Sequence, residues 1–207
     1  MSRIPLPSPE EMTPEQLAVY SRIVSGPRGK LVGPLRAVIH SPDLANRWSS
    51  IGEYLRYLTC LPAKLNELAI LVTGRRWNSQ IEFLVHAAAA RKAGLGAPAI
   101  EAIRVGQPPV FTEQDEVDVY DFARQMQQTG AVTEAVYRNV ADRWGVRGVV
   151  ELTAVIGYYT MVSMTLNAHE IVPLEGGDLP LSPVTGDGLT TLPPAADMAS
   201  AQAERKA

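Results

Sequence analysis

Apolar residues recur at intervals of three and four along most of the chain, and this spacing is typical of amphipathic α-helices. One such series consists of Leu65, Leu68, Ala69 and Val72, at positions i, i+3, i+4 and i+7. No run of residues alternates between apolar and polar for long enough to indicate a β-strand. The pattern therefore predicts an all-α protein.

Capping residues, prolines and glycines predict where the helices begin and end. Thr13 followed by Pro14 is a helix-start signal, and Ser41 followed by Pro42 repeats it. We expect the first two helices to end near residues 26 and 58, and further helices to cover residues 62–75, 79–94, 112–128, 133–145 and 147–169.

The helix that starts at residue 62 is apolar on nearly all sides, and this is the pattern of a buried helix. Glu67 lies within it, flanked on the helix surface by Ile70 and Leu71. We therefore expect a carboxylate in an apolar environment.

The helix that starts at residue 79 has two distinct stripes. We expect one stripe to face the core, and it consists of Ile81, Leu84, Val85 and Ala88. The other stripe consists of Ser79, Glu82 and His86 and continues into Ala89, Ala90 and Ala93. The first two of these polar residues also have the spacing of a capping box. The alanines leave space where a ligand or another helix can approach.

Three regions are expected along the chain. Residues 1–12 are rich in proline and predict an extended N-terminal arm, while residues 13–172 form the helical domain. From residue 172 onward Pro, Gly, Thr, Ala and Asp dominate, and hydrophobic periodicity is lost. We therefore expect residues 183–207 to form a disordered tail.

The overall charge of the chain excludes some classes of partner. The 207 residues are 46% hydrophobic, which is enough for one substantial core, and the net charge is −3. This balance gives no basis for binding to nucleic acid or a membrane surface. The most apolar window, residues 149–166, contains Glu151 and several glycine and hydroxyl residues, so a buried helix is expected rather than a membrane span. Since the N-terminus has no apolar signal core, we expect a cytoplasmic protein.

Cysteine and histidine positions limit the possible chemistry. Cys60 is the only cysteine, so neither an internal disulfide nor an internal CxxC redox pair can form. No spacing of histidine, cysteine and aspartate suggests zinc. We expect no metal and no cofactor.

Glu67, Glu82 and His86 are the candidates for acid–base chemistry. Glu82 and His86 are i, i+4 neighbours, and the short break at residues 75–78 allows the preceding helix to fold back beside them. Three titratable groups can then converge in a mainly apolar cleft. Burial and neighbouring charges shift pKa values in such clefts, and acid–base catalysts are tuned in this way.

Each of these residues also has a purely structural explanation. Glu82 could be a capping-box acid, His86 could be a core histidine, and Glu67 could pair with Arg75 or Arg76. The three residues taken together favour a functional site.

A resemblance to a known family rests on Glu67, Trp77, Ser79, Glu82, His86 and the closing sequence of residues 93–95. This set resembles the carboxymuconolactone decarboxylase and alkylhydroperoxidase D-like family. The resemblance covers about residues 15–170, and the segment that includes Tyr158 is similar to the family's last long helix. It implies an oligomeric helical bundle of about six to eight helices, assembled as a homotrimer or homohexamer.

The chain departs from the redox members of that family, which carry a CxxC between the glutamate and the histidine. Ser79 and Glu82 stand at the two cysteine positions. They cannot supply an attacking thiolate and a resolving thiol, so we expect no peroxidase activity of the CxxC kind. The resemblance then implies the decarboxylase branch, a cofactor-independent lyase that removes CO₂ from a carboxylated muconolactone in aromatic-ring catabolism.

The resemblance suggests roles for individual residues. His86 would be the general acid, Glu82 would orient and charge it, and Glu67 would be a partner acid or base. The predicted substrate-binding residues are Arg75 or Arg76 for a substrate carboxylate, Trp77 as a hydrophobic wall, Ser79 and Tyr158. The alternatives are another proton-transfer enzyme on the same fold, such as an isomerase or hydrolase, and a non-catalytic oligomer that binds a small molecule.

Overall fold

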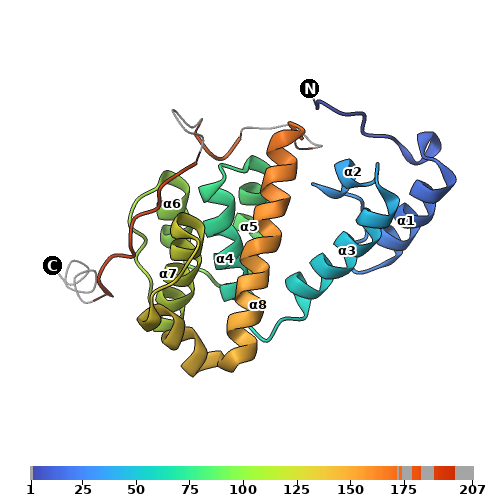
Figure 1. Ribbon diagram of the computed structural model, residues 1–207. Helices are drawn as coiled ribbons and strands as arrows, with labels where there is room; N and C mark the ends of the chain where they lie inside the picture. The colour runs from blue at the N-terminus through green and yellow to red at the C-terminus, as the bar shows by residue number, and fades with distance from the viewer. Residues whose placement is uncertain (1, 172, 174–178, 183–188, 199–207) are drawn as a thin grey trace.

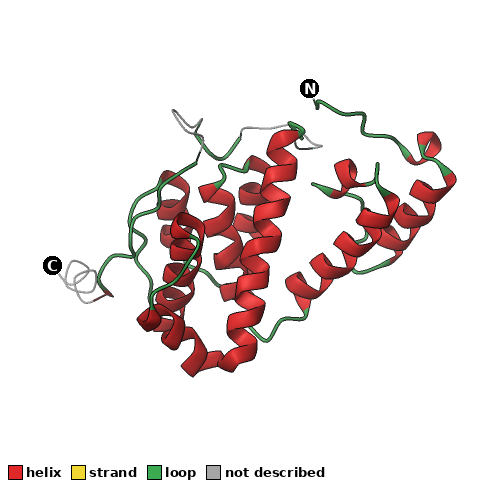
Figure 2. Ribbon diagram, in the orientation of Figure 1, coloured by secondary structure: helices red, strands yellow, loops and turns green. Residues whose placement is uncertain are grey.

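A computed structural model describes residues 2–171, 173, 179–182 and 189–198. Within these residues the protein has eight α-helices and no β-strand (Figures 1 and 2), which confirms the predicted fold class. The helices are α1 (Pro14–Ser25), α2 (Leu35–Val38), α3 (Pro42–Tyr57), α4 (Ala63–Arg76), α5 (Gln80–Lys92), α6 (Ala97–Val105), α7 (Gln114–Thr129) and α8 (Glu134–Ala168), preceded by a short 3₁₀ turn (Pro9–Glu11).

Helix α4 lies at the centre of a bundle formed by α4–α8, where it packs against α5, α7 and α8. Every residue from Leu65 to Arg75 is buried, so the prediction of a buried helix is confirmed. Glu67 is therefore held inside the protein, 7% exposed.

Helix α8 runs through the predicted break at Gly145. That residue has φ 67° and ψ −175°, which is not a helical conformation, and the two predicted helices follow each other directly across it. By length and composition α8 could cross a membrane, but 56% of its most apolar window is buried inside the protein. It packs against α3, α4 and α7, which makes it a core helix of the bundle.

The first three helices form an N-terminal lobe, residues 14–57, which sits beside α8 (Figure 1). Glu151 of α8 fixes this lobe to the bundle. One of its carboxylate oxygens accepts a 2.5 Å hydrogen bond from the Tyr54 hydroxyl, and the other accepts a 2.6 Å bond from the Cys60 backbone amide. The end of α3 and the linker that precedes α4 are thus both anchored to α8.

Helix α5 buries a different face from the one expected. Leu84 and Val85 are 41% and 43% exposed, and Ala88 is also exposed. The buried residues of this helix are instead Ile81, Glu82, Phe83, His86, Ala87 and Ala90. Glu82 and His86 of the polar stripe can enter the core because they contact each other and because His86 also contacts Glu67 of α4. The expected capping box is also wrong, since the Ser79 side chain makes no capping hydrogen bond and the Glu82 carboxylate turns toward His86.

Part of the C-terminal region differs from the expected disordered tail. Residues 183–188 and 199–207 lie outside the described residues, but residues 189–198 are packed along the bundle. Leu192 is 1% exposed, and the Thr190 amide donates to the Arg76 carbonyl. We call residues 189–198 the C-terminal strap. One leucine and a set of backbone hydrogen bonds hold it, and such a short extended segment has no periodicity that a sequence could display.

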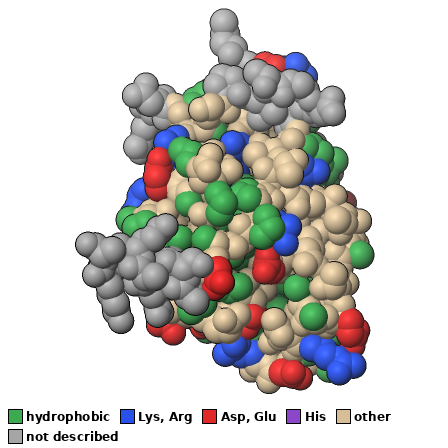
Figure 3. Space-filling model, turned by 90° about the vertical axis from the view of Figure 1, so that its left-hand side faces the viewer, with side chains coloured by type: hydrophobic (Ala, Val, Ile, Leu, Met, Phe, Trp, Pro, Cys, Tyr) green, Lys and Arg blue, Asp and Glu red, His purple; other side chains and the backbone are tan. Residues whose placement is uncertain are grey.

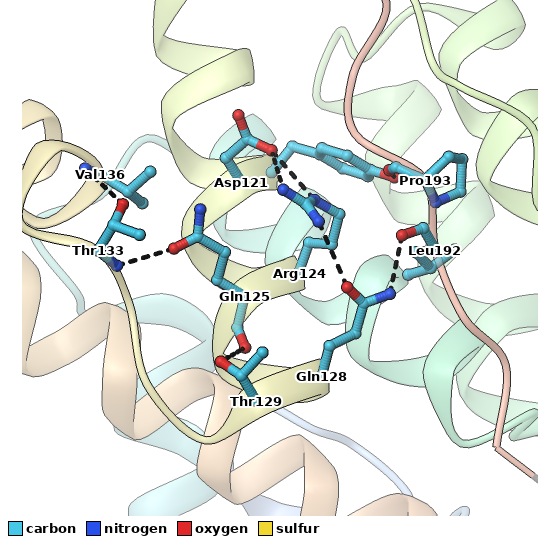
Figure 4. A network of polar contacts seen from close by, with 10 residues as sticks. Asp121, Arg124, Gln125, Gln128, Thr129, Thr133, Val136, Leu192 and Pro193 are labelled. Atoms are coloured by element: carbon cyan, nitrogen blue, oxygen red, sulfur yellow. Dashed lines mark hydrogen bonds and ion pairs between the residues drawn. The ribbon is translucent and has the colours of Figure 1, made fainter.

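Side chains of α7 hold this strap in place (Figure 4). The Gln128 side-chain amide donates to the Leu192 carbonyl, and the Tyr120 hydroxyl donates to the Pro193 carbonyl at 2.7 Å. On the face seen in Figure 3, acidic and basic side chains are interspersed among hydrophobic ones. This mixture agrees with the near-neutral net charge of the chain.

Candidate acid–base site

Glu67 from α4 and Glu82 and His86 from α5 meet inside the bundle. Nδ1 of the imidazole lies 2.5 Å from Glu67 Oε2, and Nε2 lies 3.1 Å from Glu82 Oε2. The three side chains are 10%, 7% and 3% exposed, in sequence order. The helical i, i+4 spacing places Glu82 against one ring nitrogen, and the antiparallel packing of α4 places Glu67 against the other.

The two carboxylates favour the charged form of the imidazole. Burial by itself disfavours that charge, but the hydrogen bonds and the charges of Glu67 and Glu82 outweigh burial and raise the pKa of His86 above its ordinary value. In its charged form the imidazole carries one N–H toward Glu67 and one toward Glu82.

Glu82 is less completely satisfied than Glu67. Its Oε2 atom is buried and has no hydrogen bond of acceptable geometry, although it lies at ion-pair distance from Nε2. A buried carboxylate oxygen without a full hydrogen bond carries a desolvation cost. The His86 imidazole is therefore the charged neighbour that offsets this cost.

A cavity of about 290 Å³ lies between the N-terminal lobe and the bundle, and Glu82 and His86 line it. Glu67 is not one of the described residues that line this cavity, so it stands behind the imidazole. Glu82 is consequently the carboxylate of the trio that lies on the cavity side of the imidazole. The apolar walls of the cavity include Val32, Leu35, Leu84, Val85 and Val162.

Four cationic side chains line the same cavity, and all of them come from the N-terminal part of the chain: Arg28, Lys30, Arg36 and Arg56. None of the four was among the site residues predicted from the sequence. A signal was present, since three of them lie between residues 28 and 36, within a segment punctuated by glycine and proline.

Among the four cations, Arg56 is the one whose pKa responds to the charges of Glu67 and Glu82. Burial disfavours its charge, but Tyr159, Tyr57, Glu67 and Glu82 together raise its pKa above the ordinary value. Its guanidinium lies over the Tyr57 ring at 5.5 Å. Among the described residues it has no hydrogen-bond or ion-pair partner, so its donors are available to an anion in the cavity.

Arg28, which also lines the cavity, has a similar capacity to bind an anion. Its Nε is buried and has no hydrogen-bond partner in the described part of the chain. The same guanidinium lies against the Tyr158 hydroxyl, close to Gly52, where an added Cβ would come within 2.5 Å of the guanidinium nitrogen. Gly52 is therefore the residue that leaves room for the arginine.

The predicted substrate-binding residues divide into two groups. Tyr158 lines the cavity, and its hydroxyl donates a 3.4 Å hydrogen bond to the Trp48 carbonyl. Ser79 is fully buried, with a hydroxyl that has no described partner, and it is not among the described residues that line the cavity.

The structure does not bring Arg75, Arg76 and Trp77 to the cavity. Arg75 and Arg76 donate to Thr190 of the C-terminal strap, at 2.7 and 2.9 Å, and Trp77 donates to the Gln127 side chain at 3.0 Å. The last turn of α4 points toward the strap and α7, so these side chains hold the bundle together. The alternative pairing of Glu67 with either arginine does not occur among the described contacts.

Comparisons with known proteins support the fold. No model of a known protein family matches the chain, and no curated protein matches it either. A solved structure of an alkylhydroperoxidase AhpD core, an uncharacterized peroxidase-related protein from Ralstonia eutropha, is similar with a TM-score of 0.68 and 15% identity, over 83% of this chain and 92% of that one. An uncharacterized peroxidase-related protein from a Silicibacter species is similar with a TM-score of 0.66 and 20% identity, over 83% and 91%. The chain thus has the AhpD core fold.

Proposed function

We propose that this chain is a cofactor-independent carboxy-lyase of the 4-carboxymuconolactone decarboxylase type, acting on a small carboxylated, lactone-like molecule. One observation carries the proposal: Glu82 and His86 of the buried Glu67–His86–Glu82 trio line a cavity that four cations also line. A proton donor in one cavity with a set of cations suits a substrate that is an anion and must be protonated.

The cations would bind the substrate carboxylates. Arg56 and Arg28 are the strongest candidates, because both present guanidinium groups without a carboxylate partner in the described residues. A guanidinium can hold a carboxylate through two parallel hydrogen bonds. We therefore propose Arg28 and Arg56, in place of Arg75 or Arg76, as the residues that bind a substrate carboxylate.

The reaction breaks one carbon–carbon bond and makes one carbon–hydrogen bond. The substrate carboxylate leaves as CO₂, and the electron pair of the broken bond moves through the conjugated C=C onto the lactone carbonyl oxygen. The resulting dienolate then takes a proton on carbon, and the acid that gave it is reprotonated from water. The protein must supply the proton and stabilise the dienolate.

We propose roles within the trio that differ from those suggested by the sequence. Because Glu82 and His86 both line the cavity, they would form the acid pair that delivers the proton. Glu67, bonded to Nδ1 from behind, would orient the ring and maintain its charge. Glu67 would thus have the orienting role that the sequence had suggested for Glu82.

Thiol-based peroxide reduction is a weaker proposal for this chain, although its structural neighbours are described as peroxidase-related. A disulfide cycle within one chain requires two thiols. The chain has only Cys60, which lies in the linker between α3 and α4 and is not one of the described cavity residues. Burial and the neighbouring Glu151 also raise the pKa of this thiol, which makes it a poor thiolate nucleophile.

The test is CO₂ release from 4-carboxymuconolactone by the purified protein, measured beside the variants His86→Ala and His169→Ala. The second variant is a matched control, because His169 lies at the end of α8 and is not among the described residues of the cavity. We expect turnover in the wild type and the control, and a loss of about 10²–10⁴-fold in His86→Ala.

Two results would contradict the proposal. Full turnover in His86→Ala would show that His86 is not the general acid. Absence of turnover in folded wild-type protein would reject this substrate and favour a different proton-transfer reaction, such as an isomerisation or hydrolysis, or a binding role.

A further inference from the structure

Tyr159 of α8 lies directly beside the acid pair. Its ring meets the His86 ring edge-on, with centroids 4.9 Å apart and planes at 82°, and it meets the Tyr158 ring in the same way at 5.2 Å. The residue is 4% exposed and lines the cavity. Two aromatic contacts in a packed core fix the position of this side chain, so its hydroxyl is preorganised rather than mobile.

The Tyr159 hydroxyl has no hydrogen-bond partner in the described part of the chain. Its neighbour Tyr158 differs, because that hydroxyl already donates to the Trp48 carbonyl and lies against Arg28. Buried tyrosine hydroxyls usually have a partner. A rigid phenol that lines a cavity and lacks one is suited to a ligand atom.

Charged groups of the site surround this hydroxyl. Burial raises the pKa of Tyr159 well above its ordinary value, and the charges of Glu82, Arg56 and Glu67 all act on the phenol. The hydroxyl therefore stays protonated at neutral pH and can only act as a donor or acceptor of a hydrogen bond. It also lies within electrostatic range of both the acid pair and the Arg56 cation.

We infer that Tyr159 is a further catalytic residue: its hydroxyl donates a hydrogen bond to the lactone carbonyl oxygen as that oxygen becomes the dienolate oxyanion. This inference rests on the proposed decarboxylase function. The phenol keeps its proton throughout, so the proton on the product carbon still comes from the acid pair of His86 and Glu82. Arg56, on the neighbouring wall, adds positive potential to the same oxygen.

The first experiment compares Tyr159→Phe with Tyr120→Phe. The control removes the hydroxyl of another buried tyrosine, on α7, whose one described hydrogen bond holds the C-terminal strap. Loss of an oxyanion donor costs about 10²–10³-fold in kcat. We expect that loss in Tyr159→Phe with little change in KM, and near wild-type kcat in Tyr120→Phe.

A second measurement tests stabilisation of the oxyanion separately from the loss of CO₂. The decarboxylated lactone forms the same dienolate when it loses the hydrogen on its α-carbon, so its exchange with D₂O, followed by NMR, reports dienolate stabilisation alone. We expect the exchange rate in Tyr159→Phe to fall in parallel with kcat. A residue that only holds the leaving carboxylate would slow CO₂ release and leave the exchange unchanged.

The outcomes separate this inference from the proposed function. Wild-type levels of kcat and exchange in Tyr159→Phe, together with loss of turnover in His86→Ala, would overturn the role of Tyr159 and leave the decarboxylase standing. Absence of both reactions in the wild type would overturn both. If Tyr159→Phe fails to fold, 3-fluorotyrosine at the same position keeps the ring and the hydroxyl while making the phenol more acidic. An unchanged kcat in that variant would refute the inference.

Discussion

Replacing Glu67 by glutamine removes one negative charge from the trio while it keeps the shape of the side chain. The carboxylate lies 2.5 Å from His86 Nδ1, and the two side chains are 10% and 3% exposed. A hydrogen bond to a charged group contributes about 1.5–3 kcal/mol, and removal of one member of a buried ion pair costs about 3–5 kcal/mol. Because glutamine retains an acceptor oxygen, we expect Glu67→Gln to lower the free energy of unfolding by about 1.5–3 kcal/mol near pH 6.

The pH dependence of this loss follows from the pKa of His86. Burial disfavours the imidazolium, but the bonds to Glu67 and Glu82 raise its folded pKa above the ordinary value. The stabilisation is then complete below the unfolded pKa of about 6.5 and disappears as the pH rises through the folded pKa. The difference between wild type and Glu67→Gln is consequently largest near pH 6 and shrinks in alkaline solution.

The assay is denaturant unfolding from pH 6 upward, with an NMR titration of the His86 ring in both proteins. The control is Glu134→Gln, which removes a carboxylate that is 73% exposed and paired with Arg138. We expect that control to stay within about 0.5 kcal/mol of the wild type. A loss in Glu67→Gln that is equal at every pH, or a His86 pKa that does not fall in that variant, would refute the reasoning.

Four further predictions follow from other contacts. Arg56→Gln should raise the KM for a carboxylated substrate by about tenfold or more, since a hydrogen bond to a charged group is lost; an unchanged KM in steady-state kinetics would exclude this residue from binding. Glu151→Gln should destabilise the protein by about 1–3 kcal/mol. Burial disfavours the charge of Glu151, but the hydrogen bonds from Tyr54, Arg147 and Cys60 lower its pKa to about 2. Its contribution to the stability of the fold is therefore present above the unfolded pKa near 4.5 and is lost as the pH falls. Acid unfolding would show this loss. Leu192→Ala should cost about 2 kcal/mol or more in thermal unfolding, whereas Leu189→Ala, 39% exposed, should cost little. Val150→Glu should dissociate the homo-oligomer that the family resemblance implies, because this valine is 61% exposed on an apolar face of α8. A wild-type protein that is monomeric by light scattering would contradict that assembly.

The sequence predicted the fold class and most helix boundaries because caps, prolines and glycines act locally. Thr13 caps α1 through a bond to the Gln16 amide, and Gly145 interrupts the last two helical segments where expected. The buried character of α4 was also evident, since Leu65 and the run from Leu68 to Val72 place apolar residues on nearly all sides of the helix. These features depend on neighbours in the chain and need no knowledge of distant contacts.

The face of α5 could not be predicted from periodicity, because both of its stripes are compatible with burial. Glu82 and His86 enter the core only because Glu67 arrives from another helix to complete the polar contacts. The cavity cations depend in the same way on how the N-terminal lobe docks against α8. No local pattern indicates that Arg28 and Arg56, far apart in sequence, line one cavity.

The cations and the acids that line the cavity come from two separate parts of the chain. All four cations lie between residues 28 and 56, whereas the acid pair and the carboxylate behind it lie between residues 67 and 86. On the proposed function, recognition and chemistry are therefore encoded in different segments, joined by the linker at residues 58–62. Substitutions in the lobe could exchange one anionic substrate for another while the bundle keeps the same reaction, so proteins with this fold could diverge in specificity without rebuilding their proton donor.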